Sequence, residues 1–113
     1  ETNERMSRVV EHNGTVYLAG IVSPDKTLDI KGQAQNVLKI AEERLESIGS
    51  NKDNILRVEI FVKDIYRDFK GFNEVWDAWV SKENPPARAC VETNMATAET
   101  LVEIIVTAAK ITK

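Results

Sequence analysis

Two charged residues in the last third of the chain, Arg88 and Glu103, each lie among small or apolar residues. A charge in such surroundings costs free energy unless it is paired and hydrogen-bonded. Arginine presents a planar fork of donors that binds a carboxylate through two hydrogen bonds, and glutamate can accept a proton or hold a water molecule. The two residues therefore indicate either an anion-binding site with a base beside it or a structural ion pair, which is the commoner arrangement.

The segments that carry these charges, 87–93 and 101–111, are predicted to be strands separated by a short polar connection. If they form an antiparallel hairpin, Arg88 lies opposite Glu103 on one face of the sheet. Cys90 has the same strand parity as Arg88 and would line the same face. It is expected to form a pocket wall rather than a nucleophile, because the only histidine lies far away in the sequence.

Apolar periodicity predicts the elements that position these residues. The expected order begins with strands at 7–10 and 15–19 joined by an Asn-Gly turn. A long helix follows, which Asp29 or Thr27 can cap and which runs to about Ile48 with one buried apolar stripe. A strand at 55–62, a helix at 72–80 and the two strands above complete the order. Segment 64–69 is expected to be a connection, and Gln33 and Gln35 to face solvent or a neighbouring subunit. The order ββαβαββ predicts one α+β domain over 1–113, with both helices on one face of a mixed sheet.

Composition limits the possible settings and partners. The chain has 113 residues, of which 42% are hydrophobic, a net charge of −3 and a pI near 5.2, which argues against a strongly basic nucleic-acid footprint. A single cysteine excludes an internal disulfide and favours a reducing, cytoplasmic setting. His12 and Cys90 are too few for a usual zinc site. No apolar run is long enough for a transmembrane helix, so no membrane partner is expected.

Four segments together carry a resemblance to a known family. They are Val16-Tyr17-Leu18-Ala19-Gly20, Phe72-Asn73-Glu74-Val75-Trp76, Pro86-Ala87-Arg88-Ala89-Cys90-Val91-Glu92 and Val102-Glu103-Ile104. These motifs resemble the Rid family of reactive intermediate deaminases, also called the YjgF family, over about 16–109. The third motif is the most specific. The resemblance implies a chorismate-mutase-like fold and a homotrimer with active sites at clefts between subunits.

The resemblance also implies an activity, namely hydrolysis of 2-imino or enamino acids to 2-keto acids and ammonia. The expected enzyme is a hydrolase like 2-iminobutanoate/2-iminopropanoate deaminase, with no metal or organic cofactor. In the family the motif arginine, here Arg88, binds the substrate carboxylate, and the last-strand glutamate, here Glu103, positions the attacking water. By the same resemblance Cys90 lines the pocket, Asn73 lies near the same cleft, and Gly20 lets the backbone approach the ligand.

Two positions depart from the family pattern. Many active members carry a tyrosine in an N-terminal Gly-Pro-Tyr-like segment, where this chain has Arg5-Met6-Ser7-Arg8. Where those members have Ser or Thr before the strand-ending glycine, this chain has Ala19, which is still expected to line the substrate pocket beside Gly20. The chain therefore resembles a divergent subgroup with an altered substrate range.

Three alternatives stand beside the deaminase. A non-catalytic trimer would bind small carboxylates in the same cleft and act as a regulator. An endoribonuclease is disfavoured by the acidic balance, the lone histidine and the absence of a basic, aromatic-interleaved stripe. A holdase would use exposed apolar surface, which depends on whether Trp76 and Trp79 are buried. Both tryptophans are expected to be core or interface anchors.

Overall fold

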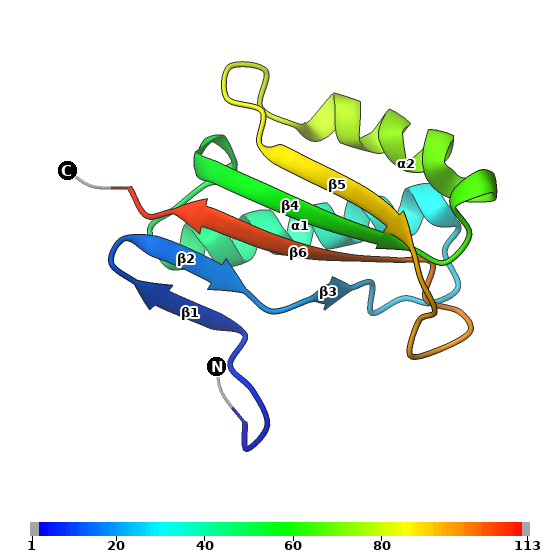
Figure 1. Cartoon of the computed structure of the whole chain (residues 1–113), viewed down its shortest axis with the longest axis horizontal. Helices are drawn as coiled ribbons and strands as arrows, with labels where there is room; N and C mark the ends of the chain where they lie inside the picture. The colour runs from blue at the N-terminus through cyan, green and yellow to red at the C-terminus, as the bar shows by residue number, and fades with distance from the viewer. Residues whose placement is uncertain (1–2, 112–113) are drawn as a thin grey trace.

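The protein folds into a mixed β-sheet with two helices packed on one of its faces. The computed structural model describes residues 3–111. Its elements are β1 (Val9–His12), β2 (Thr15–Leu18), β3 (Ile21–Val22), α1 (Ile30–Ser47), a 3-10 turn (Lys52–Asn54), β4 (Ile55–Val62), α2 (Ile65–Trp79), β5 (Ala87–Glu92) and β6 (Val102–Ala109). The strand order is β1-β2-β6-β4-β5, with β3 also paired to β6. Both helices lie on one side of this mixed sheet (Figure 1), as the sequence predicts for an α+β domain.

The core lies between the helices and one face of the sheet. The apolar stripe predicted for α1 is buried, and alternate residues of β4 and β6 face it. The fully or nearly fully buried apolar residues include Ala34, Val37, Leu38, Ala41, Leu45, Val58, Ile60, Val62, Phe72, Trp76, Val102, Ile104, Val106 and Ala108. Alternate residues of β6 point to the opposite face of the sheet, which neither helix covers within one chain (Figure 1).

Local signals at several element ends are confirmed. Asn13 and Gly14 both have positive φ, and the β1–β2 register pairs His12 with Thr15 across that two-residue turn. Asp29 caps α1, because its Oδ1 accepts a hydrogen bond from the Gly32 amide at 2.9 Å. The chain therefore enters its first hairpin and its first helix as its sequence predicts.

Two expectations about this part of the fold are wrong, and one short strand was not predicted. Segment 64–69 is not a connection: α2 starts at Ile65, and Asp64 caps it by accepting from the Arg67 amide. The short strand β3 was not predicted, since two residues give no periodicity. Gln33 is fully buried rather than facing solvent, because its amide donates to the carbonyls of Leu28 and Glu99 and accepts from the Leu101 amide.

The predicted hairpin between the last two strands is also wrong. Helix α2 connects β4 to β5 as a crossover, so β5 runs parallel to β4 and forms an edge of the sheet. Strand β6 instead pairs antiparallel with β4 on its other side. The connection 93–101 carries the chain around the end of β4 (Figure 1). Two backbone hydrogen bonds hold it there: the Thr93 amide donates to the Val62 carbonyl, and the Lys63 amide donates to the Leu101 carbonyl.

No helix within residues 3–111 combines the length and the apolar character needed to cross a membrane.

Candidate functional site

Arg88 and Glu103 lie on opposite faces of the sheet, with β4 between their strands. Arg88 is in register with Val58, whose side chain is buried beneath the helices. Glu103 is in register with Phe61, which has the opposite parity on β4. The expectation that the two charges face each other within one chain is therefore wrong, because it depended on the β5–β6 hairpin that does not form.

The side chain of Arg88 is held beneath α2 by two aromatic rings. Its guanidinium carbon lies 5.0 Å from the centroid of the Trp76 ring and 6.0 Å from that of Phe72, distances at which a cation is attracted to an aromatic face. Neither ion pair found among residues 3–111 involves Arg88. The guanidinium is therefore positioned by packing while its hydrogen-bonding fork lacks a carboxylate partner within the described chain.

Cys90 lies on the same face of β5 as Arg88, as predicted, and packs against the hydrophobic core. Burial raises the pKa of its thiol, and the nearby Arg88 charge only partly offsets this. The only histidine, His12, is on β1, the opposite edge strand of the sheet from β5. Cys90 therefore packs against the core with no histidine beside it to activate its thiol.

Asn73 follows Phe72 in α2, on the helix that covers Arg88. Its Oδ1 atom is buried and accepts no hydrogen bond from any described residue. A buried acceptor without a donor costs free energy, and such an atom calls for an explanation in a ligand or in ordered water. Asn73 therefore supplies an unused buried acceptor on the same helix as the aromatic residues that hold Arg88.

Glu103 belongs to a second cluster, on the open face of the sheet. Its carboxylate lies directly against the backbone at Gly20, because a methyl group built on Gly20 would overlap Glu103 Oε2. The β3–β6 register places Val22 beside Glu103, and the Ala19 amide donates to the Arg8 carbonyl at 2.9 Å. The structure thus places Glu103 against Gly20, the residue that follows Ala19, and it separates this cluster from Arg88, Cys90 and Asn73.

The aromatic contacts of Arg88 were missed in the sequence, where Trp76 was interpreted only as a core or interface anchor. Trp76 is buried as expected, but its ring also carries the cation. A signal was present: Phe72 and Trp76 are one helical turn apart, so they share a face of α2. Within residues 3–111, no group of three or more His, Cys, Asp or Glu side chains could hold a metal ion.

Comparison with known proteins gives consistent matches over nearly the whole chain. A family model described as Endoribonuclease L-PSP matches residues 1–110. A RutC family protein of Haemophilus influenzae is 41% identical over 106 residues, covering 92% of this chain and 90% of that protein. The RutC family protein YoaB of Escherichia coli is 38% identical over 109 residues, covering 96% and 94% of the two chains.

Solved structures give the same result. An uncharacterized protein from Pseudomonas aeruginosa superposes with a TM-score of 0.95 at 33% identity, covering 98% of this chain and 96% of that one. NMB1025 of Neisseria meningitidis, described as a member of the YjgF protein family, superposes with a TM-score of 0.95 at 38% identity, covering 99% and 92%.

Proposed function

The chain belongs to the YjgF family, whose members are also called Rid or RutC proteins, and we propose that it is a deaminase that hydrolyses reactive 2-imino or enamino acids to 2-keto acids and ammonia. The observation that carries the proposal is the Arg88 guanidinium, which rests on the Trp76 ring without a carboxylate partner in the described chain. A substrate carboxylate would complete it through two parallel hydrogen bonds.

The proposed reaction asks for positioning and proton transfer. Water adds to C2 of the protonated imine, and the C2–N π electrons move to nitrogen. Glu103 takes a proton from that water and returns it to the nitrogen. As the C2–N bond breaks and ammonia leaves, Glu103 takes the remaining hydroxyl proton, so that the C2–O bond becomes a carbonyl, and it then passes this proton to the departing ammonia. A protonated imine is already electrophilic, so the reaction needs no metal or organic cofactor.

The residues around Arg88 have matching roles in this proposal. Asn73 Oδ1, the buried acceptor without a donor, would accept a hydrogen bond from the substrate nitrogen. Cys90 would limit the pocket on the β5 side, since burial of its thiol and the raised pKa favour the neutral form. A carboxylate and an adjacent N–H are the two groups that every 2-imino acid carries, which makes this substrate class the best fit.

A complete site requires Glu103 to come from a neighbouring chain, because Arg88 and Glu103 lie on opposite faces of one sheet. We therefore propose a homotrimer with sites at the subunit interfaces. Two features support an interface: β5 is an edge strand with one unpaired side, and the open face exposes large apolar residues. These exposed residues include Val10 (50%), Tyr17 (47%) and Val91 (46%). The free thiol of Cys90 suits a reducing, cytoplasmic setting.

The proposal is tested by generating 2-iminopropanoate or 2-iminobutanoate in situ with an amino-acid oxidase and trapping it with semicarbazide. The protein should suppress semicarbazone formation and release ammonia, and Arg88→Ala should not, at unchanged oligomer size by light scattering. Equal suppression by both proteins would refute the role of Arg88.

A non-catalytic carboxylate-binding trimer is the second candidate. It is favoured by Ala19, which supplies no hydroxyl beside Gly20 and Glu103, and by segment 5–8, which supplies no tyrosine. In that case a 2-keto acid such as pyruvate would bind in an Arg88-dependent manner while semicarbazone formation remained unaffected. RNA cleavage, the activity that the matching family model's description names, has less support, because His12 lies on the opposite edge strand from β5.

A further inference from the structure

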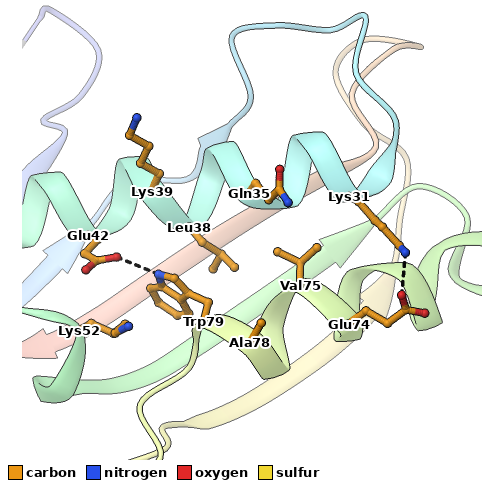
Figure 2. Close-up of a pocket in the computed structure, with 10 residues that line it drawn as sticks. All are labelled: Lys31, Gln35, Leu38, Lys39, Glu42, Lys52, Glu74, Val75, Ala78 and Trp79. Carbon is orange, nitrogen blue, oxygen red and sulfur yellow. Dashed lines mark hydrogen bonds and ion pairs between the residues drawn. The ribbon is translucent and has the colours of Figure 1, made fainter.

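A concave surface lies in the groove between α1 and α2, away from the sheet (Figure 2). Its volume is about 500 Å³, within the range of small-molecule sites. The apolar part of its lining comes from Leu38 on α1 and from Val75, Ala78 and Trp79 on α2. The groove uses neither Arg88 nor Glu103, so it is separate from the proposed catalytic residues.

Trp79 forms a fixed aromatic wall of this groove. Its indole Nε1 donates a hydrogen bond to Glu42 Oε1 at 2.9 Å, and its ring packs at 5.6 Å against that of Trp76. The one polar atom of the ring is therefore satisfied from within the protein, and its orientation is set from both sides. The remaining ring surface has no polar requirement, which suits a flat apolar group.

The charges of the groove are unevenly compensated. Lys31 pairs with Glu74 at 2.6 Å, whereas Glu42 accepts a hydrogen bond from the neutral indole and keeps its negative charge. Lys52 Nζ lies 5.6 Å from the centroid of the Trp79 ring, and within residues 3–111 no carboxylate pairs with it. The lining thus carries three lysines and two carboxylates, a surplus of one positive charge, and Lys52 is the lysine that lies over the aromatic wall. That arrangement is complementary to an anion.

We propose that the α1–α2 groove binds small planar aromatic carboxylates, with the ring packed against Trp79 and the carboxylate paired with Lys52. A cationic ligand fits less well, since Lys52 already occupies the cation position over the Trp79 ring. Lys39 also lines the groove, but it extends from α1 away from Trp79 (Figure 2). Lys39 therefore provides a matched control that removes the same charge from the same groove.

The test uses 2-naphthoate as the probe and 2-naphthamide as its uncharged counterpart. Each is titrated into ¹⁵N-labelled protein while the two indole N–H signals, from Trp76 and Trp79, are followed by NMR. For 2-naphthoate, we expect a saturable shift of the Trp79 signal with a Kd near or below about 1 mM, a typical affinity for so small a ligand. Lys52→Gln and the uncharged probe should each weaken binding about fivefold, as for an exposed ion pair.

Two controls make the outcome decisive. Lys39→Gln should leave the affinity within twofold, on the order of the error of such a titration. Arg88→Ala should leave the Trp79 shift unchanged, which separates this groove from carboxylate binding at the proposed deaminase site. The proposal is overturned if the Trp79 shift does not saturate at millimolar probe, if Lys52→Gln binds 2-naphthoate as tightly as the parent protein, or if the shift depends on Arg88 instead. A negative result in the deaminase assay would not affect the proposal that the α1–α2 groove binds aromatic carboxylates.

Discussion

The guanidinium of Arg88 lies 5.0 Å from the centroid of the buried Trp76 ring. This contact joins an edge strand to the helix that covers it, and it orients a cation that has no carboxylate partner in the described chain. A positioned guanidinium loses less conformational entropy on binding a carboxylate than a mobile one does. Trp76 is therefore a positioning residue for the proposed substrate site.

Replacing Trp76 with leucine should weaken carboxylate binding while the fold is retained. Loss of a partly desolvated cation–π contact corresponds to about a five- to thirtyfold rise in KM for an imino acid. Trp79→Leu is the matched control, because it removes a neighbouring indole that Arg88 does not contact. Steady-state kinetics of both variants, with unfolding curves beside them, distinguish positioning from general destabilisation. Equal kinetic losses in both would contradict the role assigned to Trp76.

Gly20→Ala should disturb Glu103 without unfolding the chain. The added methyl group would overlap the carboxylate, which ends a flexible side chain and can move. We expect kcat for imine hydrolysis to fall about tenfold or more, because a displaced base no longer places the water. Ala19→Ser, the adjacent change toward the family pattern, should keep or raise activity. Unchanged kcat in Gly20→Ala would show that the position of the Glu103 carboxylate does not matter.

Much of the fold can be predicted from local patterns. The Asn13-Gly14 turn, the Asp29 cap and the buried stripe of α1 each depend on a few neighbouring residues. The start of α2 could not be predicted, because its first turns reverse the usual pattern. Tyr66 there is 96% exposed, whereas the carboxylate of Asp68 is buried and paired with Arg67. A buried charge beside an exposed aromatic residue hides the helical period.

The candidate site was predicted less well than the fold, for a nonlocal reason. The residue types at Arg88 and Glu103 indicate chemistry, but their relative position depends on which strands pair. Sequence neighbours usually pair, which favoured the β5–β6 hairpin. The α2 crossover instead makes β5 parallel to β4, and β6 inserts between β4 and β2. No local pattern in segment 93–101 encodes that choice.

Gln33→Leu should destabilise the protein strongly. The buried amide of Gln33 holds the carbonyls of Leu28 and Glu99 and the amide of Leu101, so it ties the start of α1 to the start of β6. Leucine would leave these backbone groups without partners, at a cost of about 2–3 kcal/mol in the free energy of unfolding. Urea denaturation measures this, and Gln35→Leu on the exposed side of α1 should change it by less than about 0.5 kcal/mol. Similar losses in the free energy of unfolding for both variants would mean that the Gln33 hydrogen bonds do not stabilise the fold.

The thiol of Cys90 should react slowly near neutral pH. Burial raises its pKa above the ordinary value of 9.0, while the Arg88 charge lowers it by a smaller amount. Alkylation by iodoacetamide, followed by mass spectrometry, should therefore reach half its maximal rate above pH 9. Arg88→Met keeps most of the side-chain volume and removes the charge, so it should move that midpoint higher still. A midpoint below pH 9 in the native protein would contradict the buried setting.

The same shift makes a prediction about stability. The folded-state pKa of Cys90 is raised above the unfolded value. The thiol therefore contributes stability that is fully present below the ordinary unfolded pKa of 9.0 and is lost as pH rises through the folded pKa. Cys90→Ser should therefore flatten the decline in the free energy of unfolding above that pH. An identical alkaline decline in both proteins would assign it to other groups.

Mixed oligomers give the sharpest test of where the proposed site is built. Arg88→Ala and Glu103→Gln should each abolish deamination alone, since each removes one half of every site. If Arg88 of one chain works with Glu103 of the next, random reassembly of an equal mixture restores intact pairs at about a quarter of the interfaces of a closed ring. About that share of parental activity should return after co-refolding. A double variant, Arg88→Ala with Glu103→Gln, mixed with parental chains serves as the control for reassembly. If no activity returns while mixed oligomers are detected by mass spectrometry, the site lies within a single chain or the protein is not a deaminase.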